Sequence, residues 1–198
     1  MAIIVDKVQK KKDIALACKN LFVANSLKEL TVAKIALTAG ISKGSLYDYF
    51  ENKEDIIFEL LHIMLNEYDT QKKAQLESTC KTKEKIKIFA RFFYADETKE
   101  LREIYKDFIS INLTTPNKGM KAFQSECFTR YFNWMREIMQ EGINKGEIIQ
   151  ESIHIAKGLF ALAEGLFIAS STTNTINDLE TELNTNIDTI FSLIEVKQ

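Results

Sequence analysis

The sequence predicts an all-α fold, in which an N-terminal three-helix helix-turn-helix domain precedes a longer helical region. Two features of the whole chain support this. The 198 residues include one proline, Pro116, and only seven glycines, the two residue types that helix interiors tolerate least. Apolar residues also recur at spacings of three and four through most of the sequence, as is typical of amphipathic helices.

The strongest local signal lies between Thr31 and Lys53, where three helix starts follow one another closely. Thr31, Ser42 and Asn52 are each suited to cap a helix N-terminus. Gly40 lies between the first two helices, where a left-handed C-terminal cap favours glycine. This pattern predicts a helix-turn-helix with a third helix directly after it, so double-stranded DNA is the first partner to consider.

Apolar stripes define the other predicted helices. One stripe, from Ile14 to Phe22, precedes the helix-turn-helix. After it we expect helices over residues 53–68, 81–94, 99–113, 119–144, 152–171 and 176–194. Ser152 is expected to cap the fifth of these, which is apolar on nearly all sides and so is expected to be buried on several of them.

Charge is distributed unevenly along the chain. The net charge is −2, but residues 1–50 hold eight lysines and four acids, so they carry +4 and the remainder carries −6. A basic N-terminal end would attract DNA phosphates there. Lys10, Lys11 and Lys12 are interpreted either as a solvated helix start or as an arm that faces phosphates.

Composition limits the class of protein. A hydrophobic content of 45% is ample for a packed core. No stretch approaches the twenty apolar residues of a membrane span, since Glu164 interrupts the longest candidate, and the N-terminus does not fit a signal peptide. Cys18, Cys80 and Cys127 share no metal-ligand spacing, which suits a reducing cytoplasm. We therefore expect a soluble, cytoplasmic protein.

Catalytic and cofactor motifs are missing from the sequence. His62 and His154 have no nearby acid at a metal-ligand or triad spacing, and no glycine-rich phosphate loop follows a strand. Carboxylates are numerous but scattered along predicted helix faces. We expect no enzyme activity, no metal site and no cofactor.

The run GISKGSLYDYFENKEDII resembles the DNA-binding signature of the TetR/AcrR family of bacterial transcriptional regulators. The preceding segment, IALACKNLFVANSLKELTVAKIALTAG, is similar to the family's first two helices without a gap. The resemblance is close over about residues 10 to 60. It departs at Ser26 and Leu27, where the family usually has a glycine and an aromatic residue, and at Leu30, where a small or polar residue is common.

This resemblance implies a helix-turn-helix DNA-binding domain over residues 1–52 and an effector-binding and dimerisation domain over residues 53–198. It also implies a homodimer that binds a palindromic or near-palindromic operator, acts as a repressor and is released by a small, largely apolar effector. The sequence leaves activation open as well as repression. Two other classes also stay open: an architectural protein that binds DNA without sequence preference, and a helical ligand-binding module without specific DNA recognition.

The family motif, carried over residue by residue, predicts the DNA contacts. Ser45 and Asp48 are expected near base edges, where short side chains enter the groove. Tyr47 and Tyr49 are expected to hold phosphates or thymine methyls, or else to pack against their own helix. The other expected contacts fix the backbone register; they are Thr31, Ser42, Lys43, Gly44 and Lys53.

The family resemblance and the apolar composition together predict two further sites. The dimer interface is expected on the last two helices, where a four-helix bundle could form across a two-fold axis, at Ile155, Leu159, Leu162, Leu166, Leu179, Leu183, Ile187 and Ile190. An effector pocket is expected among the aromatic middle helices, at His62, Phe89, Phe93, Tyr105, Phe108, Phe123, Cys127, Tyr131 and Trp134. Ordinary core packing is the alternative for each of these residues.

Overall fold

A computed structural model describes residues 6–197, and it is helical through nearly all of that range, which confirms the predicted all-α class. The chain divides into two compact units. Unit 1 comprises Met1–Tyr68 with Glu100–Phe123, and unit 2 comprises Asp69–Lys99 with Gln124–Gln198. Two long helices, α5 and α8, each contribute residues to both units.

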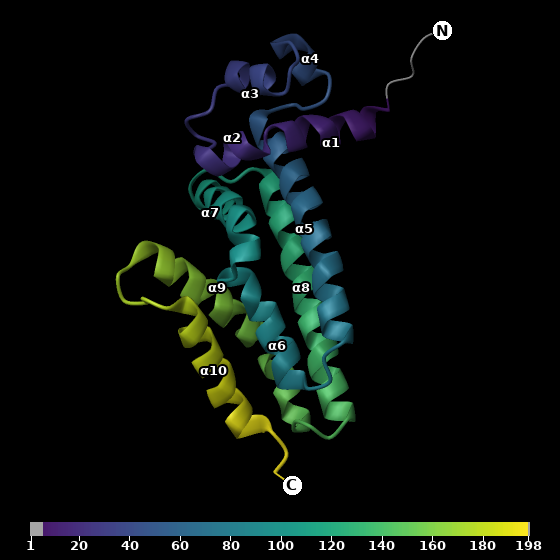
Figure 1. Ribbon diagram of the computed structural model, residues 1–198, viewed down its shortest axis with the longest axis vertical. Coiled ribbons are helices and arrows are strands. Elements are labelled where there is room, and N and C mark those ends of the chain that lie inside the picture. The colour runs from purple at the N-terminus through teal and green to yellow at the C-terminus, as the bar shows by residue number, and fades with distance from the viewer. Residues whose placement is uncertain (1–5, 198) are drawn as a thin grey trace. The chain divides into compact units, whose positions relative to one another are not determined.

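Unit 1 contains the predicted helix-turn-helix. Its elements are α1 (Lys7–Ala17), α2 (Lys19–Ala24), α3 (Val32–Thr38), α4 (Lys43–Tyr47), the first part of α5 (Lys53–Glu77), nearly all of α7 (Lys99–Thr114) and the start of α8 (Lys118–Asn144). The helix predicted from the first apolar stripe is broken at Cys18, whose thiol is buried and lies 3.7 Å from the Ile35 carbonyl oxygen. Helices α3 and α4 pack side by side (Figure 1).

The predicted helix caps of unit 1 are present. Thr31 Oγ1 accepts a hydrogen bond from the Lys34 amide at 3.2 Å, and Ser42 Oγ accepts one from the Ser45 amide at 3.0 Å. Asn52 Oδ1 accepts from the Asp55 amide at 2.9 Å. Each cap satisfies a backbone donor that the first helical turn leaves without a partner, so these residues fix where α3, α4 and α5 begin.

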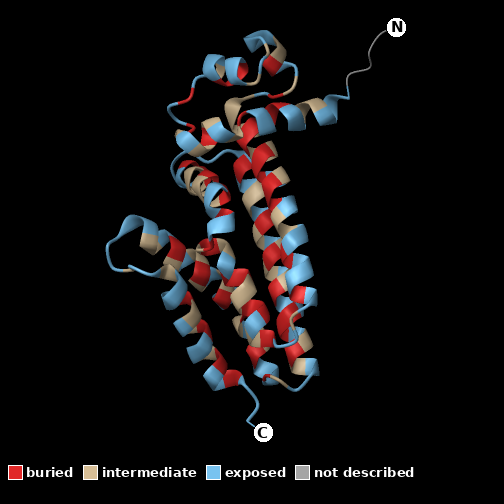
Figure 2. Ribbon diagram, in the orientation of Figure 1, coloured by how far each residue is buried: buried red, intermediate tan, exposed pale blue. Residues whose placement is uncertain are grey.

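Unit 2 is built from shorter segments around the rest of α5 and α8. They are α6 (Thr82–Ala90), η1 (Arg91–Phe93), η2 (Asp96–Thr98), η3 (Gln150–Ile155), α9 (Ala156–Thr172) and α10 (Leu179–Ile194). Helix α10 packs against α6 and α9 (Figure 1). The buried residues line the inner faces of these helices (Figure 2), with Phe191 and Phe167 among them.

The start of α9 differs from the prediction. Ser152 lies inside the 3-10 segment η3, and α9 begins only at Ala156. The Ser152 hydroxyl donates to the Ile149 carbonyl at 2.6 Å instead of accepting from a helix amide. The prediction of a cap at this serine was therefore wrong, because its side chain closes the preceding turn.

The apolar segment that contains α9 is longer than expected. Gln150–Thr172 spans 23 residues and is long and apolar enough to cross a membrane by length and composition. Core helices of soluble proteins meet the same criterion. One side of α9 packs within unit 2 through Ala156, Ala163 and Phe167, whereas Ile168 on the other side is 40% exposed. Helix α9 therefore has both a core face and an uncovered apolar face within the protomer.

Candidate DNA-binding surface and ligand sites

The turn between α3 and α4 is built around Gly40. Its φ of +67° lies in the left-handed region that side chains with a Cβ rarely adopt. The Ile41 amide donates to the Ala36 carbonyl at 3.0 Å and the Gly40 amide to the Leu37 carbonyl at 3.1 Å, which is the Schellman arrangement of a helix end. This turn sets the direction in which α4 leaves α3.

The exposed face of α4 carries the residues expected at DNA. Leu46 and Phe50 are buried at 2% and 4% exposure and anchor the helix in unit 1. Exposed residues of the expected set are Thr31, Ser42, Lys43, Gly44, Tyr47 and Asp48, while Ser45 and Tyr49 are half-buried. The helix therefore presents basic, hydroxyl and phenol groups outward while its apolar residues hold it in place.

Three of the expected DNA contacts, Ser42, Ser45 and Lys53, also make contacts within the protein. The Ser45 hydroxyl lies 2.9 Å from that of Ser42, so the two hydroxyls orient each other at the start of α4. The Lys53 ammonium donates to the carbonyl of Leu27 at 2.6 Å and to that of Leu30 at 3.0 Å. Lys53 thereby ties the α2–α3 loop to the first turn of α5.

A second contact holds the same loop from α7. Asp107 Oδ1 accepts from the Ser26 hydroxyl at 2.8 Å, and Oδ2 accepts from the Leu27 amide at 2.6 Å. Ser26 and Leu27 are the positions where this loop departs from the pattern of the resembling family. The unusual serine thus supplies a hydroxyl that the Asp107 carboxylate binds, and we call this set of contacts the Asp107 clamp.

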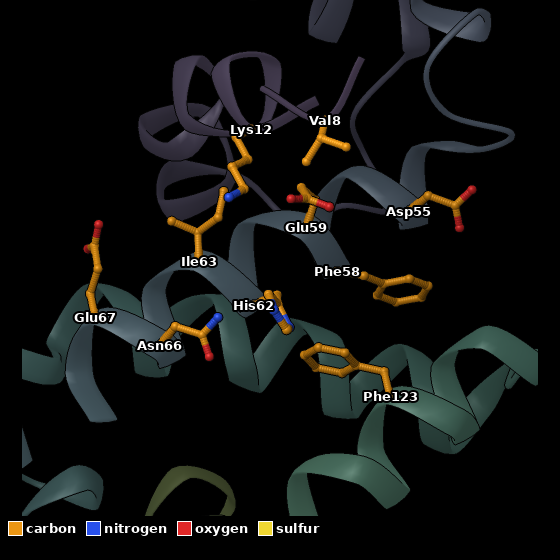
Figure 3. Close-up of a pocket in the computed structure, with 10 residues that line it drawn as sticks. All are labelled: Val8, Lys12, Asp55, Phe58, Glu59, His62, Ile63, Asn66, Glu67 and Phe123. Carbon is orange, nitrogen blue, oxygen red and sulfur yellow. The ribbon is translucent and has the colours of Figure 1, made fainter. Parts of the chain in front are cut away.

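A groove of about 590 Å³ opens on unit 1 (Figure 3). It is lined from α1 by Val8 and Lys12, from α8 by Phe123, and from α5 by Asp55, Phe58, Glu59, His62, Ile63, Asn66 and Glu67. The rings of Phe58 and Phe123 stack at a centroid distance of 5.8 Å. Two residues expected at an effector, His62 and Phe123, therefore share this groove.

The charged groups that line the groove are mainly acidic. It carries three carboxylates against one ammonium, and Asp55 is already engaged by the amides of Glu51 and Asn52. Within residues 6–197, Glu59 and Glu67 make no hydrogen bond or ion pair. Glu67 is exposed and Glu59 half-buried, so both carboxylates reach solvent, and the groove does not resemble a closed apolar pocket.

The other seven predicted effector residues do not line this groove. Tyr105 and Phe108 lie in unit 1, where Phe108 is fully buried and contacts Phe58 and Phe123 edge to face. The other five, Phe89, Phe93, Cys127, Tyr131 and Trp134, lie in unit 2. The nine residues thus fall into two groups, one in each unit.

In unit 2 the aromatic residues gather around a lysine. The Lys72 ammonium lies 4.4 Å from the ring centroid of Phe89, 4.9 Å from that of Tyr131 and 5.6 Å from that of Trp134, all within cation–π range. The Lys72 side chain is only 3% exposed. Three of the predicted effector residues therefore surround a buried positive charge.

Two other charged groups complete this set, which we call the Lys72 cluster. Asp69 Oδ2 accepts from the Tyr131 hydroxyl at 3.1 Å and lies 3.5 Å from Arg130 Nη2. Burial lowers the pKa of Lys72 to about 8 and raises the pKa of Asp69 above its ordinary value. For both groups the loss of water outweighs the attraction between them.

Sequence reasoning missed Lys72, although a signal was present. Leu65 and Leu76 lie seven residues before and four residues after it, on the inward stripe of α5, and both are buried. A lysine on an apolar stripe is an exception that can be seen in a single sequence. No comparable signal marks Asp107, because its contacts are with residues about eighty positions away.

The predicted interface residues differ in how far they are buried within the protomer. Leu159, Leu183 and Ile187 are at most 5% exposed within the protomer, so they belong to the core of unit 2. Ile155, Leu162, Leu166, Leu179 and Ile190 are half-buried. Leu193, which was not on the predicted list, is 76% exposed on α10.

No group of three or more His, Cys, Asp or Glu side chains among the described residues is placed to hold a metal ion. The thiols of Cys18 and Cys127 are buried, and burial raises the pKa of each to about 11. Such thiols are protonated near neutral pH and react slowly. Among the described residues, the functional features are thus the exposed face of α4, the groove and the Lys72 cluster.

Comparisons with known proteins agree with this geometry. Residues 14–60 match the family described as bacterial regulatory proteins, tetR family. The fatty acid metabolism regulator protein of Bacillus subtilis (strain 168) is 27% identical over 144 residues, which cover 72% of each chain. The HTH-type transcriptional regulator QacR of Staphylococcus aureus is 25% identical over 175 residues, covering 85% of this chain and 89% of QacR.

Solved structures share the fold over nearly the whole chain. A transcriptional regulator from Saccharomonospora viridis, in complex with choline, superposes with a TM-score of 0.78 at 15% identity, covering 96% of this chain and 99% of that one. The regulator FadR from Bacillus subtilis, in complex with stearoyl-CoA, gives a TM-score of 0.70 at 22% identity, covering 91% and 97%. The chain thus carries a tetR-family helix-turn-helix at residues 14–60 and shares the overall helical fold of TetR-family transcriptional regulators, a family of DNA-binding proteins that are not enzymes.

Proposed function

We propose that this chain is a dimeric, cytoplasmic repressor that binds a palindromic or near-palindromic operator and is released by a small, largely apolar effector. The main support for the proposal is the exposed face of α4. Leu46 and Phe50 anchor this helix in the core, and the turn at Gly40 sets its direction. Relatives named as regulators of fatty acid metabolism or crystallised with choline or stearoyl-CoA support a response to a small molecule.

DNA contact is assigned to residues of the α4 face. Ser45 and Asp48 are proposed to approach base edges, and Tyr47 and Tyr49 to contact phosphates or thymine methyls, while Lys43 contacts the phosphate backbone. Thr31, Ser42 and the Gly44 amide are proposed to contact the backbone nearby. For Lys53 we propose a positioning role as well, since its ammonium already holds the loop at Leu27 and Leu30.

The dimer is proposed to form through α9 and α10. Its most exposed apolar residues are Leu193 at 76% and Ile168 at 40%, with the half-buried members of the predicted set beside them. Covering such a face removes apolar area from water. Two copies related by a two-fold axis would present two α4 helices to the two halves of a palindrome.

Coupling is proposed to pass along α5. This helix starts at Lys53, beside the loop that Lys53 holds, and continues past Lys72 in unit 2. Residues 1–52 act as the DNA-binding domain and residues 53–198 as the effector and dimerisation domain in this proposal. An effector weakens DNA binding only if it binds more tightly to the conformation with mis-spaced α4 helices.

Selection of fragmented host DNA by the purified protein at physiological salt, followed by sequencing, tests the proposal. Recovery of a few palindromic sites supports a specific dimeric regulator, and the neighbouring genes indicate the effector class. Uniform recovery would instead favour an architectural protein. A complete lack of recovery by the folded dimer would favour a ligand-binding module without DNA recognition.

A further inference from the structure

The groove on unit 1 is lined mainly by one face of α5, with further residues from α1 and α8 (Figure 3). Its lining residues on α5, from Asp55 to Glu67, recur mostly at spacings of three and four, so they share a face of the helix. Its volume of about 590 Å³ lies within the range of about 300–1,000 Å³ that is usual for small-molecule sites. The groove therefore has room for a small organic ligand.

The charged groups of the groove leave it negative. Asp55, Glu59 and Glu67 supply three carboxylates and Lys12 supplies one ammonium, so these four groups sum to −2. Within residues 6–197, no ion pair or hydrogen bond includes the side chain of Lys12, Glu59 or Glu67. The described part of the chain thus leaves two carboxylates of the groove without an ion partner.

The carboxylates are spread along α5 instead of meeting at one point. Glu67 lies twelve residues after Asp55, which corresponds to about 18 Å of helix. Asp55 is also engaged by the amides of Glu51 and Asn52. Among the described residues, no group of three acidic, His or Cys side chains is placed to hold a metal ion. This arrangement suits an elongated organic cation better than a metal ion.

Aromatic and apolar side chains line the same groove. The rings of Phe58 and Phe123 stack at a centroid distance of 5.8 Å with an interplanar angle of 15°, and both residues are half-buried. Val8 is 64% exposed, and Ile63 is half-buried. A ligand body that covers these side chains removes their remaining apolar area from water. Aromatic rings also attract a nearby organic cation.

We propose that the groove binds a small organic cation, which consists of an ammonium group attached to an apolar or aromatic body. The ammonium lies beside Glu59, which is half-buried and follows Phe58 in the chain, and the body covers the stacked rings and Val8. Glu67, at the other end of the groove (Figure 3), adds attraction at longer range. The proposal rests on the proposed function and specifies its effector as positively charged.

Other classes of ligand fit the groove less well. An acid would find a single ammonium, that of the exposed Lys12, and would be repelled by the carboxylates of Glu59 and Glu67. A neutral ligand would make the same apolar contacts without the attraction between charges. Among ligands that share one body, the cation is therefore expected to bind most tightly and the anion least tightly.

The experiment compares three probes of similar length: 4-phenylbutylamine, 4-phenylbutanamide and 4-phenylbutyrate. They are a cation, a neutral amide and an anion at pH 7. Each is titrated into the full-length protein without DNA, and calorimetry gives its affinity. Methyl NMR signals of Val8 and Ile63 report on the groove, and Ile187, in the core of unit 2, is the reference. A repeat at high salt shows the contribution of charge, because salt screens exposed charges.

The tested variant combines Glu59→Gln with Glu67→Gln, which removes both charges and keeps the size of the side chains. The matched control combines Glu54→Gln with Glu77→Gln. These two glutamates lie on the same helix, one half-buried and one exposed like the tested pair, but they do not line the groove. Lys12→Gln is a third variant, because it removes the ammonium of the groove. Melting temperatures and far-ultraviolet circular dichroism show that each variant is folded.

The amine is expected to bind roughly fivefold or more tightly than the amide, to shift the two groove methyl signals and to weaken with salt. The tested variant loses most of this preference, the control keeps it, and Lys12→Gln binds the amine more tightly. Binding of the acid or the amide as tight as that of the amine would overturn the assignment. So would shifts confined to residues outside the groove, an unchanged preference in the tested variant, or no binding of the amine. DNA selection is measured without these probes, so such failures would leave the proposed DNA-binding function intact.

Discussion

Individual side chains in unit 1 act mainly by holding backbone ends in place. Thr31, Ser42 and Asn52 each accept a bond from an amide of the helix they begin. Replacing such a cap by alanine typically costs about 1 kcal/mol. The residues that cap α3 and α4 are also exposed, so they remain available to a phosphate on the outer side.

Substituting Lys43 tests whether a side chain of α4 contacts DNA. It is exposed at the first turn of α4, so Lys43→Ala is expected to weaken binding to all sequences by a similar factor. The slope of log affinity against log salt should fall by about one, because one fewer counterion is released. Fluorescence anisotropy over a salt series measures this. Lys106→Ala, on α7, should leave the slope unchanged, and an unchanged slope for Lys43→Ala would remove Lys43 from the contacts.

The buried ammonium of Lys72 predicts how the free energy of unfolding changes with pH. Its pKa is about 8 in the folded protein and 10.5 ordinarily, so between these values the unfolded chain binds the extra proton. Rising pH therefore stabilises the folded state through this group. The free energy of unfolding of the wild type, minus that of Lys72→Met, should rise by roughly 2–3 kcal/mol between pH 7 and pH 10.

Urea unfolding of both proteins at several pH values measures that difference. The thiols and phenols that titrate over the same range are present in both proteins, so their contributions cancel. A difference that stays constant or falls with pH would show that burial does not disfavour the Lys72 ammonium.

At the scale of elements, α7 and α5 hold one loop from two sides. The Asp107 clamp binds Ser26 and Leu27, and the Lys53 ammonium binds carbonyls of the same loop. This loop leads directly into Thr31, the cap of α3. The position of the helix-turn-helix is therefore determined partly by residues far away in the sequence.

Asp107→Ala is expected to loosen this loop. The Leu27 amide loses its acceptor, and a partly buried donor without a partner costs about 1–3 kcal/mol. Hydrogen exchange measured by mass spectrometry should become faster over residues 26–30. Glu103→Ala is the control, because Glu103 lies on the same helix and pairs with Lys106 instead of the loop. Unchanged exchange in the loop of Asp107→Ala would show that the clamp does not restrain it.

For the whole molecule, the proposed dimer would form through the exposed apolar residues of α9 and α10. Leu193→Arg is expected to give a monomer, because it places a charge on that face while the protomer core is untouched. Light scattering at several concentrations measures the mass. Leu113→Arg is the matched control, since Leu113 on α7 is also 76% exposed. A Leu193→Arg protein that is as dimeric as the wild type would place the interface elsewhere.

Much of the architecture could be predicted from the sequence because it depends on local rules. Caps, the Gly40 turn and the apolar stripes act within four residues of one another. Ser152 shows where such rules fail, since its hydroxyl closes a turn and the helix starts later. Leu183 and Ile187 lie on a well-defined stripe, yet periodicity does not tell a core face from an interface.

The positions of the candidate ligand sites were harder to predict, because they depend on which helices meet. Aromatic side chains at helical spacing do not reveal which of them meet, and the nine candidates fell into two separate groups. The Lys72 cluster depends on α5, α6 and α8 coming together, which is a property of the tertiary structure. Only the lysine on an apolar stripe could be seen beforehand.

The most direct test of the central claim is the ratio of affinities for a recovered site and for a scrambled duplex of the same length and composition. It is measured at physiological salt with the full-length protein. A sequence-specific regulator predicts a ratio of roughly 10³ or more. A ratio near one, with both duplexes bound, would contradict the account and indicate a protein that binds DNA without recognising its sequence.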